Sequence, residues 1–383
     1  MSADLPLALY VHMPWCVRKC PYCDFNSHQL KSAQPDRAYI DSLIRDLDCE
    51  LPLLAGRAIT TVFFGGGTPS LFHPEEFKRL LSALRQRTEV AGDAEITLEA
   101  NPGTIERGRF AEYAQAGINR VSLGAQTFAP RALELLGRIH TADDTHRAVE
   151  ELRAAGIGNF NLDLMYALPQ QSFDEAMEDV RAACALNPSH ISYYQLTLEP
   201  GTVFHARPPP LPDEELAWEI QTEAQRRLAA AGYLQYEVSA YARAGAQCRH
   251  NLNYWRFGDY VGLGAGAHGK LSMAVPERIL RTAKPKQPRD YQQRMAQADS
   301  ACGERNFIAP KDLPFEFMLN ALRLNEGFET GDFQRRTGLS SRVVEPALAR
   351  AQERGLLEPR TGGWRPSALG RRFLNDLQAG FLA

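Results

Sequence analysis

Three cysteines lie within eight residues near the start of the chain, at Cys16, Cys20 and Cys23. Thiolates in a loop with the spacing C-x3-C-x2-C are suited to an iron–sulfur cluster, and a [4Fe–4S] cube takes one ligand per iron. Three cysteines would therefore leave one iron open to an outside ligand. Two other interpretations stay open here: a zinc site completed by His12 or His28, and free thiols.

The chain has seven cysteines, and the other four are scattered (Cys49, Cys184, Cys248 and Cys302). Clustered thiols in a large intracellular chain bind metal or do redox chemistry more often than they form disulfides. Cys49 and Cys184 stand in apolar, helix-like segments, so we interpret them as packing residues.

Further groups that could bind a small ligand follow the predicted strands. Glycines Gly65 to Gly67 leave their backbone groups open to a ligand at close range. Carboxylates and amides can hydrogen-bond amino and hydroxyl groups, and an arginine can pair with a carboxylate. The side chains concerned are Glu99, Gln126, Arg138 and Asp163. Any one of these side chains, taken alone, could equally well form a salt bridge at the rim of a barrel instead of binding a ligand.

Alternating strand-like and helix-like patterns predict how these residues are positioned. The expected strands are Leu7–His12, Thr61–Phe64, Glu95–Glu99, Arg120–Ala125, Phe160–Met165 and His190–Leu196. The expected helices between them include Glu75–Arg87, Ile105–Ala116, Thr145–Ala155 and Phe173–Leu186. Six such repeats predict an α/β fold, a partial TIM-like (β/α)6 barrel, in which loops after the strands meet at one rim.

The pattern changes after the prolines at 208–210, so we predict three parts: residues 1–207, 208–290 and 291–383. In the middle part we expect a helix over Glu214–Ala231, a strand over Tyr233–Tyr241 and a connecting loop over Arg278–Asp290. In the last part the sequence pattern predicts a small winged-helix-like domain, with helices at Phe315–Leu324, Gly331–Thr337, Ser341–Arg354 and Ala368–Leu377. Residues 310–383 hold 11 Lys and Arg against 9 Asp and Glu, which argues against nucleic-acid binding.

The composition is that of an ordinary globular protein, with 44% hydrophobic and 23% charged residues and a net charge of -3. This charge gives no particular attraction to nucleic acid or to an acidic membrane. The first residues lack a secretory signal and no segment is long and apolar enough to span a membrane, so we expect a cytoplasmic protein.

These motifs together resemble the radical SAM superfamily. The matching segments are Tyr10 to Cys23, Gly-Gly-Gly-Thr-Pro at 65–69, Glu-Ala-Asn-Pro at 99–102, Leu-Gly-Ala-Gln at 123–126 and Asn-Leu-Asp-Leu at 161–164. The resemblance covers essentially the whole chain. It implies a [4Fe–4S] cluster on the three cysteines and S-adenosylmethionine (SAM) on the open iron. It also implies a set of SAM-pocket residues: Tyr10, Tyr22, Gly66, Gly67, Thr68, Glu99, Gln126, Arg138 and Asp163.

Within the superfamily the chain resembles the branch that contains oxygen-independent coproporphyrinogen III oxidase and the HemW-type haem chaperones. The oxidase has a further cysteine where this chain has Phe25, and a longer segment before the residue matching Tyr10. Both differences argue against decarboxylation of coproporphyrinogen and for the chaperone type.

A second element, His250-Asn-Leu-Asn-Tyr254-Trp255, is similar to the HNxxYW element of HemW-type proteins. An imidazole is a common axial ligand of haem iron, and the two aromatic side chains offer flat faces to a porphyrin. The alternative is a histidine satisfied in the core with aromatics that simply pack. The expected function is a haem chaperone that passes haem to acceptor proteins, respiratory ones among them; whether the chain pairs with itself stays open. The competing functions are a radical SAM enzyme that oxidises a porphyrinogen, and a structural zinc protein.

Overall fold

The computed structural model describes residues 5–31, 36–103, 108–273, 278–297 and 302–382. Its main feature is a 12-stranded open sheet in the order β14-β13-β12-β11-β1-β4-β5-β6-β7-β8-β10-β9. Six neighbouring strands run parallel: β1 (Leu7–Met13), β4 (Ile59–Gly66), β5 (Val90–Ala100), β6 (Arg120–Gln126), β7 (Phe160–Tyr166) and β8 (His190–Gln195). All six predicted strands are confirmed, and so is the predicted fold class.

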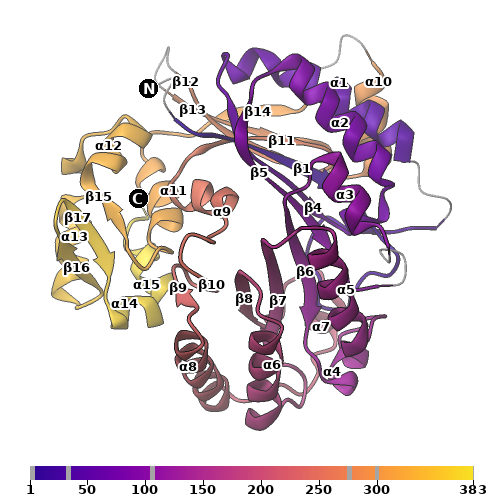
Figure 1. Ribbon diagram of the computed structural model, residues 1–383. Coiled ribbons are helices and arrows are strands. Elements are labelled where there is room, and N and C mark those ends of the chain that lie inside the picture. The colour runs from indigo at the N-terminus through magenta and orange to yellow at the C-terminus, as the bar shows by residue number, and fades with distance from the viewer. Residues whose placement is uncertain (1–4, 32–35, 104–107, 274–277, 298–301, 383) are drawn as a thin grey trace.

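Helices cover the outer side of these parallel strands, and the strands curve around the inside (Figure 1). The helices along this part of the chain are α1 (Asp36–Leu54), α2 (Pro74–Arg87), α3 (Phe110–Ala116), α4 (Pro130–Leu135), α5 (Ala142–Ala154), α6 (Phe173–Ala185), α7 (Val203–Ala206) and α8 (Glu214–Ala230). The predicted helix at Ile105–Ala116 corresponds to α3, Phe110–Ala116, and its first three predicted residues, 105–107, lie outside the described residues. Capping boxes start two of the helices, with Thr141 and Asp144 at α5 and Ser172 and Glu175 at α6.

The sheet continues beyond these six strands at both ends. On one side β1 pairs in parallel with β11 (Asp259–Leu263), and antiparallel strands follow: β12 (His268–Met273), β13 (Arg278–Ala283) and β14 (Glu304–Phe307). On the other side lie β10 (Ala240–Ala242) and β9 (Leu234–Gln235). The first strand of the chain is therefore an interior strand, held between segments 50 and 250 residues away.

Two predictions for this middle part are wrong. Arg278–Asp290 is not a connecting loop, because it forms β13 and the start of α10 (Pro288–Ala296). In this strand Ile279, Leu280 and Thr282 are buried, while Arg278 is exposed and Arg281 pairs with Glu316. The single strand expected at Tyr233–Tyr241 is two short strands, because the chain turns between β9 and β10 and the two pair with each other.

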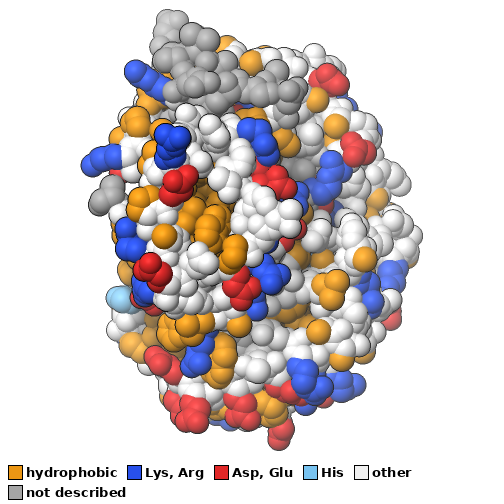
Figure 2. Space-filling model, turned by 90° about the vertical axis from the view of Figure 1, so that its left-hand side faces the viewer, with side chains coloured by type: hydrophobic (Ala, Val, Ile, Leu, Met, Phe, Trp, Pro, Cys, Tyr) orange, Lys and Arg blue, Asp and Glu red, His pale blue; other side chains and the backbone are white. Residues whose placement is uncertain are grey.

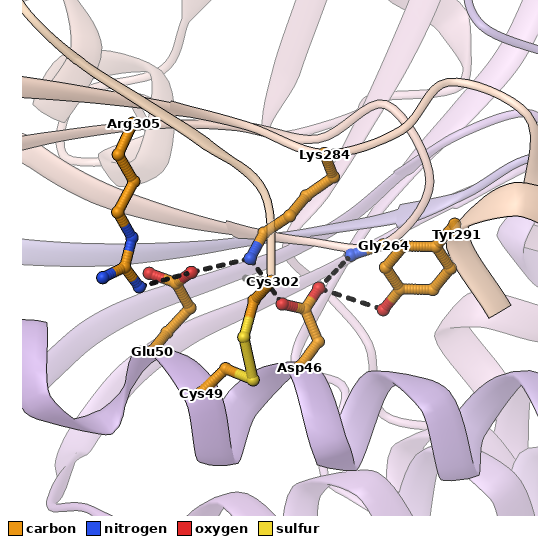
Figure 3. The surroundings of a disulfide bond; sticks show 8 residues. All are labelled: Asp46, Cys49, Glu50, Gly264, Lys284, Tyr291, Cys302 and Arg305. Atoms are coloured by element: carbon orange, nitrogen blue, oxygen red, sulfur yellow. Dashed lines mark hydrogen bonds and ion pairs between the residues drawn. A yellow bond between two sulfur atoms is a disulfide. The ribbon is translucent and has the colours of Figure 1, made fainter. Parts of the chain in front are cut away.

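Cys49 is not the packing residue that we predicted, because it forms a disulfide with Cys302, 253 residues further along the chain. Cys49 lies on α1, beside a buried ionic cluster that Figure 3 shows. In this cluster Lys284 lies 2.5 Å from Asp46 and 2.6 Å from Glu50, and all three side chains are at most 1% exposed. Disulfide and ion pairs together fasten α1 to the antiparallel end of the sheet.

The last part of the chain packs around Phe317, Phe328 and Phe333, in a hydrophobic cluster that also includes Phe257 and Ile279 of the middle part. It contains α11 (Leu313–Ala321), α12 (Thr330–Thr337), α13 (Glu345–Glu353), α14 (Ala368–Arg372), α15 (Leu374–Ala379) and a sheet of β15 (Phe328–Glu329), β17 (Gly363–Pro366) and β16 (Leu357–Arg360). On the side of the molecule where this unit lies, basic and acidic side chains are interspersed (Figure 2).

A search of the described helices for membrane spans finds none that is sufficiently long and apolar.

Candidate functional site

The cysteine loop leaves the sheet at the end of β1 and is closed at its base by a short parallel pair, β2 (Trp15–Cys16) with β3 (His28–Gln29). Backbone hydrogen bonds from His28 N to Pro14 O and from Leu30 N to Cys16 O fix this base. Near the far end of the loop Asn26 Nδ2 donates to Ala265 O and to Lys286 O, each at 2.9 Å. The antiparallel extension of the sheet thus holds the loop in place.

The thiols of Cys16, Cys20 and Cys23 are free, and each has a polar neighbour. Thr68 Oγ1 donates to Cys16 Sγ (3.5 Å), Arg138 Nη1 to Cys20 Sγ (3.7 Å), and Ser27 Oγ lies 3.7 Å from Cys23 Sγ. Burial raises the pKa of Cys16, and the hydrogen bond from Thr68 opposes this effect. The hydrogen bond from Thr68 thus acts in favour of the Cys16 thiolate, which is the form that binds metal, and burial acts against it.

The predicted site residues come together around one cavity of about 390 Å³. Its wall contains Cys16, Cys20, Tyr22, Cys23, Gly66, Gly67, Thr68, Glu99, Gln126, Arg138 and Asp163. We call it the cysteine cavity. Tyr10 is the exception, because its side chain lines the neighbouring cavity instead and hydrogen-bonds His12 Nδ1 at 2.9 Å.

The glycines after β4 supply a bare backbone at this cavity. Gly66 has φ +115°, and a Cβ there would lie 2.5 Å from the ring of His12. A Cβ on Gly67 would lie 2.5 Å from Trp15 O. Packing against the protein therefore excludes side chains at both positions, and the two backbone nitrogens donate to Glu99 Oε2 and to Met13 O.

Two carboxyl groups, Glu99 and Asp163, face the cysteine cavity from neighbouring parts of the sheet. Burial, together with the negative charge of Asp163, raises the pKa of Glu99 to about 8, although Gly66 N donates to Glu99 Oε2 at 3.1 Å. Burial also raises the pKa of Asp163, against hydrogen bonds from Asn161 and Ser122. A cationic amino group placed between these carboxyls would stabilise their ionised forms.

A second cavity, of about 650 Å³, adjoins the first, and we call it the aromatic cavity. The two share wall residues, among them Phe25, Gly66, Glu99 and Asp163. Aromatic side chains form much of the rest of its wall: Tyr10, Phe63, Tyr194, Tyr254, Trp255, Phe257 and Tyr260. Its size and apolar faces are those of a site for a flat organic ligand.

The helix α9 (Arg249–Trp255) carries the predicted haem element into this wall. His250 is 1% exposed, and both of its ring nitrogens are engaged: Thr61 Oγ1 lies 2.8 Å from Nδ1 and the Tyr254 hydroxyl 2.9 Å from Nε2. Burial and the nearby charge of Arg120 lower the pKa of His250 to about 3, so the ring is neutral. In this arrangement His250 orients Tyr254 and offers no free nitrogen to an iron.

Sequence reasoning did not identify Arg120 or Asn101 as site residues. Asn101 links two predicted ones, because its Nδ2 donates to Thr68 Oγ1 at 3.0 Å and its Oδ1 accepts from Arg138. Arg120 is buried in the wall of the aromatic cavity. The alternation Arg120, Ser122, Gly124, Gln126 along one face of β6 was the available signal, since alternate residues of a strand share a face.

In the described ranges, no three or more His, Cys, Asp and Glu side chains are assembled around a single metal-ion position.

Comparison with known proteins gives consistent results along the whole chain. Residues 10–183 match the family model described as the radical SAM superfamily, and residues 308–373 match the HemN C-terminal domain. The chain is 48% identical over 379 residues to the haem chaperone HemW of Escherichia coli (strain K12), covering 99% of this chain and 98% of the relative. It is 46% identical to the haem chaperone HemW of Haemophilus influenzae, covering 98% of both chains.

Among solved structures, the chain is similar to coproporphyrinogen III oxidase (HemN) from Escherichia coli, with a TM-score of 0.83 and 23% identity. The match covers 99% of this chain and 91% of the other. At this identity the likeness concerns the fold.

Proposed function

Because the chain belongs to the HemW family of the radical SAM superfamily, we propose that it is a haem chaperone, which binds haem and transfers it to acceptor proteins. The observation that carries the proposal is the pair of adjoining cavities: one has three free thiols and a bare glycine backbone in its wall, and the other is lined with aromatic rings. The named relatives are haem chaperones at 48% and 46% identity over nearly the whole chain.

We assign the [4Fe–4S] cluster to Cys16, Cys20 and Cys23. The residues present fit the group, because the three thiols are free, line one cavity and are flanked by hydrogen-bond donors. The cluster, when bound through three thiolates, supplies one iron with an open coordination position for the amino and carboxylate groups of SAM.

The remaining residues of the cysteine cavity are assigned to SAM. Gly66 and Gly67 line the cavity without side chains, and Glu99 and Asp163 receive amino or ribose hydroxyl groups. Arg138 holds its guanidinium beside Cys20 and Asn101, where its charge can stabilise the thiolate and meet a carboxylate. Tyr22 and Gln126 complete the wall, and Tyr10 acts from the neighbouring cavity by fixing His12 beneath Gly66.

Haem is assigned to the aromatic cavity. Tyr254 and Trp255 present their rings to it from α9, and His250 holds Tyr254 by a hydrogen bond. A porphyrin buries two large apolar faces, which aromatic walls of this kind accept. We infer that His250 positions Tyr254 for haem.

The test for cargo is anaerobic titration of the purified protein with haem, followed by absorbance. A saturable Soret shift at a fixed stoichiometry is expected, and linear, non-saturating absorbance would reject the chaperone proposal. Transfer is then measured by mixing haem-loaded protein with an apo haem protein.

The test for the cluster compares Cys20→Ala with Cys184→Ala, since Cys184 is a free thiol packed against the core away from the site. After anaerobic reconstitution, Cys184→Ala is expected to contain iron and sulfide like the parent, while Cys20→Ala loses most of both. Full cluster content in Cys20→Ala would reject the ligand assignment. Zinc in place of iron and sulfide in the parent would favour the structural zinc interpretation.

The shared wall of the two cavities also favours a second candidate, a radical SAM enzyme that oxidises a porphyrinogen, because a radical formed at SAM would lie beside the aromatic cavity. Phe25, in that shared wall, has no thiol to take part in such chemistry. Anaerobic incubation with coproporphyrinogen III, SAM and a reductant decides between the two, since a vinyl-bearing product would identify the enzyme.

A further inference from the structure

Arg120, the first residue of β6, is a buried arginine whose charge has no bonded partner. Its side chain is 2% exposed and lines the aromatic cavity. Among the residues that the structure describes, none forms a hydrogen bond or ion pair with this guanidinium, and its Nε is completely enclosed without an acceptor. Buried arginines are almost always paired, so this arrangement leaves donors available for a ligand.

The nearby acceptors are already used. The carboxylate of Glu95 accepts from the backbone nitrogens of His250 (3.1 Å) and Arg249 (3.2 Å), which fixes the start of α9. The carboxylate of Asp163 accepts from Ser122 and Asn161. Burial lowers the pKa of Arg120, but the surrounding thiol and carboxyl groups, Glu95 among them, outweigh burial and raise it, so the guanidinium stays charged.

Lys270 and Arg281, which also line the wall, differ from Arg120 because they have hydrogen-bond partners within the protein. Lys270 donates to Phe257 O, Gly258 O and Asp259 Oδ1. Arg281 donates to the Tyr260 hydroxyl and to Glu316. Among the described residues of the aromatic cavity wall, Arg120 is thus the arginine or lysine that has no hydrogen-bond or ion-pair partner.

We propose that Arg120 receives a carboxylate of the molecule that occupies the aromatic cavity; resting on the function proposed above, this carboxylate is a propionate of haem. A guanidinium can hold a carboxylate through two parallel hydrogen bonds, and burial strengthens them. The wall shared with the cysteine cavity presents the carboxyl groups of Glu99 and Asp163 in place of a cation, whereas Arg120 lines only the aromatic cavity. The propionate edge therefore points toward Arg120, and the macrocycle lies against the aromatic rings.

The experiment measures the equilibrium affinity of the full-length protein for haem and for haem dimethyl ester, which has the same macrocycle without propionate charges. The parent is expected to bind haem at least 10-fold more tightly than the ester, in line with a charge-assisted hydrogen bond. In Arg120→Gln the affinity for haem is expected to fall by roughly 10- to 100-fold, with the affinity for the ester unchanged. Arg120→Lys keeps the positive charge, so its affinity for haem should fall less than that of Arg120→Gln.

Arg256→Gln is the matched control, because Arg256 is half-exposed, pairs with Glu326 and lies outside the cavity. It should leave both affinities unchanged. A titration with SAM on the same proteins separates the two carboxylate sources: if Arg120→Gln weakens SAM and not haem, the carboxylate is that of SAM and the haem assignment is overturned.

Equal affinity of the parent for haem and its ester overturns the inference even if every Arg120 variant fails to fold, while the chaperone function stands. An equal fall in the affinity of Arg120→Gln for haem and for haem dimethyl ester also overturns the inference. Absence of any haem binding to the parent rejects the proposed function, and the propionate assignment with it.

Discussion

Replacing Lys284 with methionine tests the buried ionic cluster that supports the site. The substitution keeps most of the volume and removes the charge that lies between Asp46 and Glu50 (Figure 3). Breaking a buried ion pair on one side costs roughly 3–5 kcal/mol. Asp46 keeps hydrogen bonds from Gly264 N and the Tyr291 hydroxyl, so we expect the lower end, about 3 kcal/mol.

The effect should reach the cysteine loop as well as the overall stability. Asp46 accepts from the nitrogen of Gly264, and the next residue, Ala265, accepts from Asn26 of the loop. For a chain of 383 residues about 3 kcal/mol corresponds to a fall in Tm of roughly 4 °C. Circular dichroism measures this fall, and iron and sulfide analysis after reconstitution measures the effect on the loop.

The difference in Tm between the parent and Lys284→Met should also depend on pH, in a direction that follows from the pKa of Asp46. Burial raises the pKa of Asp46, and the charge of Lys284 lowers it, so Lys284→Met raises it further. A carboxyl whose pKa is higher in the folded than in the unfolded state costs stability above its folded pKa, and this cost disappears as the pH falls toward the unfolded value. The difference in Tm between parent and variant should therefore be smaller at pH 5.5 than at pH 8. The exposed Lys286→Met serves as the control and should change Tm little.

Two results would refute this reasoning. One is a Lys284→Met protein as stable as the parent at pH 8. The other is a difference in Tm that grows as the pH falls.

The other predictions concern the cysteine cavity and the disulfide. Because the pKa of Glu99 is about 8, its carboxylate is lost as the pH falls below that value; SAM affinity measured by calorimetry should fall roughly 10-fold from pH 7.5 to 6, and Glu99→Gln should remove this slope. Gly66→Ala should abolish SAM binding, since its Cβ would lie 2.5 Å from His12, whereas Gly56→Ala, with φ +73° and no atom within 4 Å, should only lower Tm slightly. Cys49→Ser should cost roughly 2–4 kcal/mol, and a reductant should lower the Tm of the parent but not of this variant.

Each of these has an outcome that contradicts it: a pH-independent SAM affinity in the parent, equal SAM binding by the two glycine variants, and a parent whose Tm does not respond to reductant.

The parallel part of the fold was predictable because each β/α unit is local. A buried strand and an amphipathic helix within about 30 residues carry their own periodicity. The strand from Phe160 to Tyr166 was predicted within one residue of its end. The resemblance to the radical SAM superfamily and its HemW-type branch is confirmed by the matching relatives.

The helix Asp36–Leu54 was missed for a physical reason. Its buried face contains Asp46 and Glu50, which interrupt the apolar stripe that identifies a helix. Their partner, Lys284, comes more than 230 residues later, and Cys302 is as distant from Cys49. Periodicity within one segment carries no information about such partners.

At the site, sequence reasoning identified polar residues at or near the ends of strands and Asp163 within β7, and it missed Arg120 at the start of β6. Glu99 and Gln126 follow predicted strands, and both lie in the cysteine cavity. Arg120 begins a strand otherwise rich in apolar and small residues, and its burial becomes apparent only when the neighbouring strands are in place. The roles of the individual site residues stay predictions until the variants above are measured.

The interior position of β1 has a consequence during synthesis. One edge of this strand can pair with β4 soon after both leave the ribosome, but its other edge awaits β11, roughly 200 residues later. At ordinary translation rates that interval lasts roughly 10–40 s, during which unpaired peptide groups beside the cysteines stay accessible. We expect nascent chains to need protection by folding helpers at this stage, and the thiols to be open to an iron–sulfur donor before the last strands close the sheet.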